Sequence, residues 1–320
     1  MFSKKILTIC IPTYNRKERL LNQLRSIFNQ LKYSCTNIVI LDNCSNYNVL
    51  QELNNSFSEK ELSNVELIQR PYNIGMVGNL STSFLYCKTK WMWLLSDDDE
   101  TCKESIDLIL ENIEKNPDIA VFKFSIEGFA PEEDKIISTI NEFIEYYKSG
   151  LHKSGNMIFI SNNVFNLDIL NPYLGYTNVY SYTYVPHLVS VIAGLSEKKI
   201  QLKFCPENIV KYISPDPSSK WNFLQVLLGI SSFADIDFGL DKKQHHILCM
   251  LVFRNFSLTT LISQLFRIKD RWRRKYIFKK IFSSFYGYET KKRWISYLIF
   301  YFIYYSRIDK VCDVGKFWGK

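Results

Sequence analysis

The sequence predicts an α/β fold, a doubly wound and mostly parallel sheet flanked by helices, followed by a basic α-helical C-terminal region. Three observations lead to this prediction. Short apolar runs alternate with segments of helical periodicity through the first 100 residues, as in successive βαβ units. Hydrophobic residues make up 47% of the chain, which is ample for a buried core. Residues 241–320 carry 18 lysines and arginines against five acidic residues, whereas the rest of the chain is mildly acidic.

The apolar runs of the first 100 residues are predicted to be buried strands. The run at 6–11 is rich in β-branched residues and almost wholly apolar, which is typical of a parallel strand covered on both faces. In the segment after it, Leu20, Leu24 and Ile27 recur at helical spacing. By the same criteria, strands are expected at 6–11, 37–41, 65–68 and 91–96, and helices at 16–30, 49–57 and 76–87.

Beyond residue 100 the alternation continues for a shorter distance. The Pro-Asp-Pro-Ser-Ser run at 215–219 is the clearest loop and predicts a boundary between 1–215 and a helical, basic region at 216–320. Further elements are expected as a helix at 106–113, a strand at 119–124, and one more sheet unit made of a strand at 157–160 and a helix-like stretch at 163–170.

The eight cysteines are scattered and include no CxxC pair, so no zinc site or disulfide framework is expected. The chain passes from Met-Phe-Ser-Lys-Lys straight into a predicted strand, which predicts no secretory signal. A reducing cytoplasm is therefore the expected compartment.

Polar side chains follow each of the first four predicted strands, at the edge where open α/β sheets bind ligands. The first loop offers backbone amides, an aromatic face and a guanidinium suited to phosphate or a nucleobase. The second offers a carboxylate for ribose hydroxyls, the third a tight turn with an amide, and the fourth three adjacent carboxylates. The loops comprise Pro12, Thr13, Tyr14, Asn15 and Arg16; Asp42; Asn73 to Gly75; and Asp97, Asp98 and Asp99.

Three adjacent carboxylates repel one another unless a positive charge lies beside them. Mg²⁺ or Mn²⁺ fits this position, because such hard cations take oxygen ligands and keep places for phosphate oxygens. The alternative is a solvated turn that caps the following helix, with Asp99 or Thr101 at the N-cap. Each other loop has a similar alternative: Asn15 as an N-cap, Asp42 as a turn former and Gly75 as an ordinary turn glycine.

Four runs of this sequence resemble the family 2 glycosyltransferases of the GT-A fold. They follow the order and spacing of that family, and the resemblance extends over about residues 5–215. It implies a GT-A catalytic domain at 1–215, with its acceptor-side segment at about 125–215. The four runs are ICIPTYNR at 9–16, ILDNCS at 40–45, NIG at 73–75 and WLLSDDD at 93–99.

The resemblance implies an inverting transferase that uses a nucleotide-diphosphate sugar and a divalent cation, Mn²⁺ or Mg²⁺. Asp42 would contact the nucleoside. Asp98 would be the main metal ligand, with Asp97 beside it near the ribose or donor sugar, and Asp99 would support the metal or contact the sugar. Ser96 stands where many relatives have the first aspartate of the DxD-type motif. The donor-binding residues implied are Pro12, Thr13, Tyr14, Asn15, Arg16, Asp42, Asn73, Gly75, Asn79, Asp97 and Asp99.

An inverting transfer needs a base that takes the proton from the acceptor hydroxyl. Relatives usually carry a Glu-Asp or similar pair in the later part of the domain, but no Asp or Glu lies between Asp168 and Glu197. His187 lies in that stretch, and an ordinary histidine pKa of about 6.5 suits a base at neutral pH. The alternative is an inert histidine on a helix face. Asp216, in the predicted loop, is the second candidate for the base.

Residues 265–307 are basic, aromatic and amphipathic. The most aromatic part, 294–305, has 12 residues, fewer than the roughly 20 that span a bilayer. Such a segment suits an anionic membrane surface, where Trp and Tyr lie at headgroup level. The alternative is a helical subdomain with a solvated basic face. Nucleic acid is not expected as a partner, because no nucleic-acid-binding motif accompanies the basic residues.

Together these features predict a transferase on the inner face of the cytoplasmic membrane. It would add one sugar to a lipid-linked oligosaccharide during surface-polysaccharide assembly of the O-antigen or capsule type. The alternatives are a transferase with a soluble or protein acceptor and a non-catalytic nucleotide-sugar-binding protein at the membrane surface. A Rossmann dehydrogenase is disfavoured, because no GxGxxG turn follows the first strand.

Overall fold

The computed structural model describes residues 5–32, 35–149, 154–213, 223–253, 264–285 and 290–306. Contacts between residues divide the chain into two compact units. The first consists of residues 1–152, 158–181 and 186–218, and the second of 153–157, 182–185 and 219–320. Separate roles for 1–215 and 216–320 stay a prediction.

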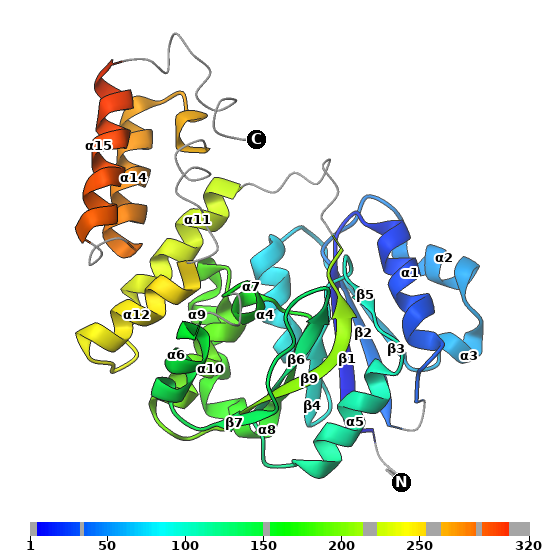
Figure 1. The fold of residues 1–320 in the computed structure, drawn as a ribbon. Coiled ribbons are helices and arrows are strands. Elements are labelled where there is room, and N and C mark those ends of the chain that lie inside the picture. The colour runs from blue at the N-terminus through cyan, green and yellow to red at the C-terminus, as the bar shows by residue number, and fades with distance from the viewer. Residues whose placement is uncertain are drawn as a thin grey trace. The chain divides into compact units, whose positions relative to one another are not determined.

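Among the described residues, nine strands form one sheet in the order β3-β2-β1-β4-β8-β6-β9-β5, with β7 paired to β9 (Figure 1). The neighbours β3, β2, β1 and β4 are parallel, as are β6 and β9, whereas β8 lies antiparallel between β4 and β6. The strands are β1 Leu7–Thr13, β2 Thr36–Asp42, β3 Val65–Gln69, β4 Trp91–Leu94, β5 Glu100–Thr101, β6 Val121–Glu127, β7 Lys135–Ile137, β8 Asn163–Asn166 and β9 Leu202–Lys211.

Helices connect these strands and cover the sheet, so the predicted α/β fold class is confirmed. Several helix starts are capped by side chains: Asn48 accepts from the Gln51 amide, and Ser58 with Glu61 forms a capping box. The helices up to residue 196 are α1 Lys17–Phe28, α2 Val49–Ser56, α3 Glu59–Leu62, α4 Met76–Tyr86, α5 Ser105–Lys115, α6 Ile140–Lys148, α7 Ser154–Ile158, α8 Leu167–Leu170, α9 Leu174–Val179 and α10 Pro186–Ser196, with short 3₁₀ turns η1 Asn171–Tyr173 and η2 Ser181–Thr183.

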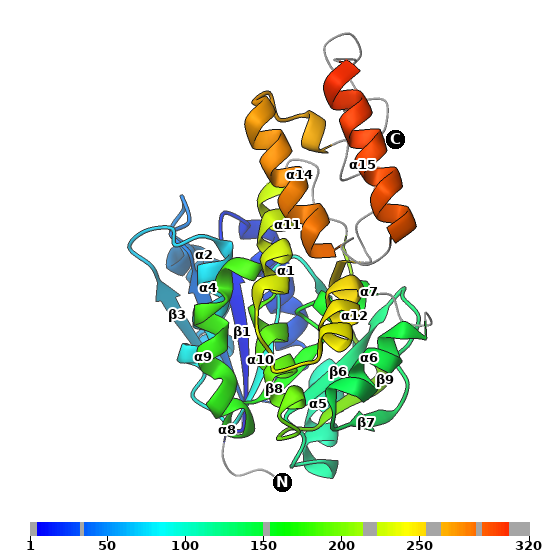
Figure 2. The ribbon, with the colours of Figure 1, turned by 90° about the vertical axis from the view of Figure 1, so that its left-hand side faces the viewer.

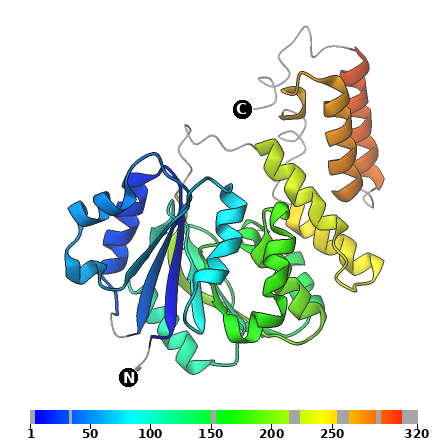
Figure 3. The same cartoon turned by 180° about the vertical axis from the view of Figure 1, so that it is seen from behind.

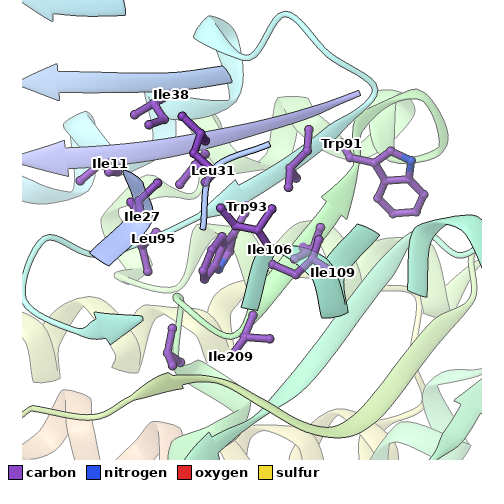
Figure 4. Packing of buried hydrophobic residues seen from close by; sticks show 14 of the residues in the cluster. Ile11, Ile27, Leu31, Ile38, Trp91, Trp93, Leu95, Ile106, Ile109 and Ile209 are labelled. Carbon is purple, nitrogen blue, oxygen red and sulfur yellow. The ribbon is translucent and has the colours of Figure 1, made fainter. Parts of the chain in front are cut away.

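Alternate residues of the central strands face opposite sides of the sheet. On β1, Ile9 and Ile11 join a large apolar cluster with α1, α2 and α5. Cys10, between them, contacts the other side, where its thiol lies 3.9 Å from the Ser83 carbonyl of α4. Figure 4 shows Trp93 of β4 packed in the large cluster beside Ile106 of α5. Because burying each such side chain stabilises the fold by about 1.5–3 kcal/mol, this packing fixes the strand ends that carry the polar loops.

The prediction of a strand at 157–160 is wrong. Helix α7 covers Ser154–Ile158, and the strand is β8, Asn163–Asn166. The helix-like stretch expected at 163–170 is correct only for its second half, where the Asn166 side chain caps α8.

The physical reason is a buried cation on the neighbouring strand. Lys123 of β6 is 2% exposed, and its Nζ donates to the side-chain oxygens of Asn162 and Asn163 at 3.1 Å each. Burial lowers the pKa of Lys123 to about 7, against the influence of Glu132. A buried ammonium needs such oxygen partners, so both asparagines are buried, Asn163 as the first residue of β8 and Asn162 directly before it.

The second unit is helical among its described residues, as expected. Helices α14 and α15 lie side by side in the front, turned and rear views (Figures 2 and 3). Among the described helices, none combines the length and apolar character that crossing a bilayer requires. The elements are α11 Phe223–Ser231, η3 Ser232–Asp235, α12 Lys242–Phe253, α14 Arg271–Phe285 and α15 Thr290–Ser306.

Candidate functional site

The sheet register brings the predicted polar loops to one edge. Thr13 at the end of β1 pairs with Asp42 at the end of β2, and Asp42 pairs in turn with Gln69 of β3. Cys10 of β1 pairs with Leu94, so the aspartate loop leaves β4 beside the first loop. Parallel strands therefore place residues from four distant parts of the chain together.

The Pro12–Arg16 loop is attached to the loop after β2 through Asn15. The Asn15 amide donates to the Ser45 hydroxyl at 2.9 Å, and the Asn15 side-chain oxygen accepts from the Asn46 amide at 2.7 Å. Asn15 has a φ of 54°, the left-handed region that asparagine tolerates. The N-cap of α1 is Arg16, so the alternative in which Asn15 caps this helix is wrong. Tyr14 is 43% exposed, which leaves its ring accessible.

Asp42 is buried at the end of β2, where its Oδ1 accepts from the Ser45 amide at 3.0 Å. It is thus a turn former, in agreement with the alternative interpretation. One Asp42 oxygen can stabilise the turn while the carboxylate also binds a ligand, because a carboxylate accepts several hydrogen bonds. Burial, with the charge of Asp42 as the second cause, raises the pKa of the nearby Tyr47 to about 12.

The Asn73–Gly75 turn is joined to the Asp42 loop by reciprocal amide contacts. Asn43 donates to the Asn73 side chain at 2.8 Å and accepts from the Ile74 amide at 3.0 Å. Gly75 has a φ of 80° and is the N-cap of α4, so the turn needs glycine there. Asn79, one turn into α4, donates to the Leu41 carbonyl at 2.8 Å.

Asn79 also accepts from the Arg70 guanidinium at 2.8 Å and is 3% exposed. These contacts hold α4 against β2, and a donor-binding role for Asn79 stays a prediction.

The three aspartates do not form a solvated helix cap. Asp97 is 2% and Asp99 9% exposed, and α5 begins only at Ser105, with β5 in between. The alternative with Asp99 or Thr101 as N-cap is therefore wrong.

Arg16 is the cation that the structure places beside the triplet. Its Nη1 donates to Asp97 at 2.7 Å and to Asp98 at 2.8 Å. The hydroxyl of Thr13 donates to the second oxygen of Asp97 at 2.7 Å. Arg19 lies farther away, 3.9 Å from Asp98. The loop after β1 thus contacts the aspartate loop after β4 through both a hydroxyl and a guanidinium.

Burial shapes the charge of the cluster. It raises the pKa of Asp97 to about 6, although Arg16 acts in the opposite direction. It also raises the pKa of Asp99 to about 7, against the hydrogen bond from Ser161. Burial thus disfavours the charged form of two carboxylates of the cluster, and such shifted pKa values are common at functional sites.

Residues 8–166 match the sequence model of a family described as Glycosyl transferase family 2. This stretch is a family 2 glycosyltransferase domain. It includes all four polar loops and ends at the last residue of β8, so the predicted resemblance is confirmed over this span.

Two curated relatives match parts of the chain. An uncharacterized glycosyltransferase of Haemophilus influenzae is 32% identical over 144 residues, which cover 42% of this chain and 47% of that protein. The abequosyltransferase RfbV of Salmonella typhimurium is 29% identical over 115 residues, 36% of this chain and 34% of that protein. The chain therefore spans about half the length of the first relative and about a third of the second.

Solved structures share the fold of the glycosyltransferase domain at low identity. S. aureus TarS 1-349 in complex with UDP-GlcNAc gives a TM-score of 0.59 at 13% identity, over 87% of this chain and 81% of that one. The mannosyltransferase PcManGT from Pyrobaculum calidifontis, in complex with GDP-Man and Mn²⁺, gives 0.55 at 12% identity, over 88% and 74%. These likenesses confirm the predicted GT-A fold.

The aspartate loop of the glycosyltransferase domain fits a divalent cation in its chemistry. Among the described residues, no three carboxylate, imidazole or thiol side chains gather as a complete ligand set. Asp97, Asp98 and Asp99 nevertheless supply hard oxygens, and the carboxylates of Asp97 and Asp98 both contact the Arg16 guanidinium. Asp98 is the most accessible, with 17% of its side chain exposed. Phosphate oxygens would then complete the coordination of the cation.

Ser161 is a residue of the glycosyltransferase domain that the sequence did not single out. Its hydroxyl donates to Asp99 at 2.5 Å and accepts from the Ser96 amide at 2.9 Å, while its carbonyl accepts from the Trp93 indole at 2.7 Å. The Ser96 hydroxyl donates to Asp98, so the serine that departs from the family motif supports its neighbour. No local pattern reveals Ser161, because its partners lie 62 to 68 residues away.

Of the two candidate bases, the structure describes only His187. His187 lies in α10 and is 2% exposed. Burial, assisted by the charge of Lys123, lowers the pKa of His187 to about 3. This favours the inert alternative, and the role of His187 as a base stays a prediction. Asp216 lies outside the described residues.

Proposed function

We propose that this protein transfers a sugar from a nucleotide-diphosphate sugar to an acceptor hydroxyl, with inversion at the anomeric carbon. The observation that carries the proposal is the joining of the β1 and β4 loops, in which Thr13 and Arg16 hold Asp97. This arrangement places a guanidinium and carboxylates beside the loop of Asp42. One edge of the sheet thereby offers partners for a nucleoside, a diphosphate and a cation.

In this proposal each donor group has its own loop. Asp42 accepts from the nucleoside, while Tyr14 and the amides of the Pro12–Arg16 loop line the base and phosphates. Asn73 and Gly75 close the side toward α4, and Asp97 and Asp99 lie by the ribose and the sugar. The donor class is supported by the structural neighbours, which include complexes with UDP-GlcNAc and with GDP-Man.

A divalent cation, Mn²⁺ or Mg²⁺, would be held by Asp98 with Asp97. When bound, it neutralises the charge that grows on the leaving diphosphate. Arg16 contributes a second positive charge at the same place, as its contacts to both carboxylates indicate. The mannosyltransferase neighbour contains Mn²⁺, which supports this choice.

Inversion requires the acceptor hydroxyl to attack from the side opposite the diphosphate, and a base must take its proton. Asp216 is the stronger candidate, because the buried His187 has a pKa lowered to about 3. A base with so low a pKa gives little driving force for removing a hydroxyl proton at neutral pH.

We further propose a lipid-linked oligosaccharide as acceptor, in O-antigen or capsule-type polysaccharide assembly at the inner face of the cytoplasmic membrane. The similarity to an abequosyltransferase supports a surface polysaccharide. The basic C-terminal region suits an acceptor that carries phosphates. A soluble or protein acceptor is the second candidate, and the glycosyltransferase family match argues against a purely non-catalytic protein.

A thermal-shift panel of nucleoside diphosphates and their sugars, with and without Mn²⁺, tests the donor. At one ligand concentration, a ligand that binds more tightly raises the melting temperature more, so the correct donor is the nucleotide sugar with the largest Mn²⁺-dependent shift. Release of nucleoside diphosphate from that donor then tests for transferase chemistry. Asp98→Asn should abolish both the Mn²⁺-dependent shift and the release. Binding of a donor without any release in the presence of candidate acceptors would instead indicate a non-catalytic protein.

A further inference from the structure

Helix α15 has two aromatic faces, and one of them is used to pack against α14. Phe300 of α15 is fully buried and stacks on Phe278, with 3.7 Å between ring centroids and 5° between ring planes. The Arg271 guanidinium donates to the Tyr304 carbonyl at 2.8 Å and lies 4.4 Å from the centroid of its ring. These contacts join the two helices through a single side of α15.

The other face of α15 is exposed. Trp294, Leu298, Phe302 and Tyr305 follow one another at steps of four, four and three residues, so they form one stripe along the helix. Each is 66 or 67% exposed. We call these four residues the α15 stripe. A hollow of about 520 Å³ runs along this side and is lined by the stripe together with Tyr297 and Tyr301.

Exposed apolar surface of this kind is unfavourable in water, at about 25 cal/mol per Å². Single exposed hydrophobic residues are normal on proteins, but contiguous patches usually mark a binding surface. The stripe is contiguous over about three turns of one helix, and packing against α14 does not require it. A partner with an apolar surface is therefore indicated.

The surrounding charge identifies that partner. Residues 264–306 contain 11 lysines and arginines and two acidic residues. Arg273 and Lys279 are exposed on α14. A second copy of the chain would bring an equal positive charge to the contact, which costs energy. An anionic lipid surface instead offers apolar chains to the stripe and negative headgroups to the basic residues.

We propose that the α15 stripe is a membrane-docking surface that inserts into the interface of an anionic bilayer. The helix lies in the plane of the membrane, with Trp294 and Tyr305 near the headgroups and Leu298 and Phe302 directed toward the acyl chains. The basic residues of α14 bind the headgroups. This deepens the proposed function by naming the surface that reaches a lipid-linked acceptor, but docking itself requires neither donor nor cation.

The full chain, without donor or divalent cation, would be tested by flotation with two kinds of vesicle. Vesicles of phosphatidylcholine mixed with phosphatidylglycerol should bind it, and phosphatidylcholine alone should bind it weakly. Leu298→Glu should lower binding to the mixed vesicles by about tenfold or more, because it buries a charge in place of an apolar side chain. Leu85→Glu is the matched control, since Leu85 is 67% exposed on α4; it should leave binding unchanged.

Equal binding by wild type and Leu298→Glu would overturn the proposal. So would a concentration-dependent dimer, seen by light scattering, that the same substitution dissociates. Phe302→Ser gives a second, uncharged test of the stripe, and the melting temperature of each variant shows whether it is folded. Nucleotide-sugar binding by the same samples separates the two proposals, because loss of docking at unchanged donor affinity leaves the transferase assignment intact.

Discussion

The hydroxyl of Thr13 donates a hydrogen bond of 2.7 Å to the carboxylate of Asp97, although 84 residues separate them in the chain. Both groups are buried. This contact and the Arg16–Asp97 ion pair join the loop after β1 to the loop after β4. The position of the aspartates therefore depends on the first loop as much as on the strand that carries them.

Thr13→Val removes this hydroxyl and keeps the shape of the side chain. It should lower the free energy of unfolding by about 1–3 kcal/mol, because a buried carboxylate oxygen loses its partner. It should also weaken nucleotide-sugar binding, measured by calorimetry. Thr8→Val is the control on the same strand: Thr8 is buried and lies 2.7 Å from the Thr89 hydroxyl, away from the polar loops. Equal donor affinity in both variants would contradict the role given to Thr13.

Stability should depend on pH through the buried aspartates. Burial raises the pKa of Asp97 to about 6 and that of Asp99 to about 7, above the ordinary aspartate value of 3.8. The folded state therefore binds more protons than the unfolded state between about pH 4 and 7, and the free energy of unfolding should fall as pH rises through this window. Urea unfolding from pH 4.5 to 7.5 measures the slope.

Asp99→Asn should make that slope smaller, because the amide does not titrate. Asp118→Asn, at an exposed position, should leave the slope as it is in the wild type. A slope unchanged by Asp99→Asn would show that Asp99 already ionises normally in the folded protein.

Ser161→Ala should loosen the aspartate loop. The substitution removes the donor to Asp99 and the acceptor of the Ser96 amide, with an expected loss of about 1–3 kcal/mol in the free energy of unfolding. Mn²⁺ affinity in the presence of nucleoside diphosphate, followed by electron paramagnetic resonance, should fall. Ser190→Ala is the matched control, since this buried hydroxyl bonds within α10 to the Pro186 carbonyl. A normal Mn²⁺ affinity in Ser161→Ala would remove Ser161 from the site.

His187→Leu should leave turnover within about tenfold of the wild type at saturating donor. The reason is that a buried histidine with a pKa of about 3 is a weak base near neutral pH. Steady-state kcat is the measurement, with donor affinity measured in parallel. A fall of about a hundredfold at unchanged donor affinity would identify His187 as the base after all.

The sequence predicts the first four strands to within about two residues, because each is a short, mainly apolar run that ends at polar loop residues. The strand expected at 6–11 is Leu7–Thr13, and the one expected at 37–41 is Thr36–Asp42. The polar loops are predictable for a related reason: parallel strands place their carboxyl ends at one edge of the sheet. Local pattern and sheet geometry together were enough to place the candidate donor loops.

Features that depend on partners far apart in the chain could not be predicted. Strand β8 begins and ends with asparagine in the sequence, and the buried ammonium of Lys123 helps to explain why Asn162 and Asn163 are buried. The role of Ser161 could not be predicted either, because its partners are also far away in the chain. The pairing of Arg16 with Asp97 and Asp98 crosses 81 and 82 residues and has no local signal. Two-residue β5 is too short to leave a periodic pattern.

The antiparallel strand β8 also determines when the aspartate cluster can form during synthesis of the chain. A nascent chain that ends before residue 161 has Thr13, Arg16 and all three aspartates, but it lacks β8, the antiparallel neighbour of β4, and the hydroxyl that donates to Asp99. The matched family span ends at 166, the last residue of β8. The cluster is therefore finished only when the last residues of that span have left the exit tunnel.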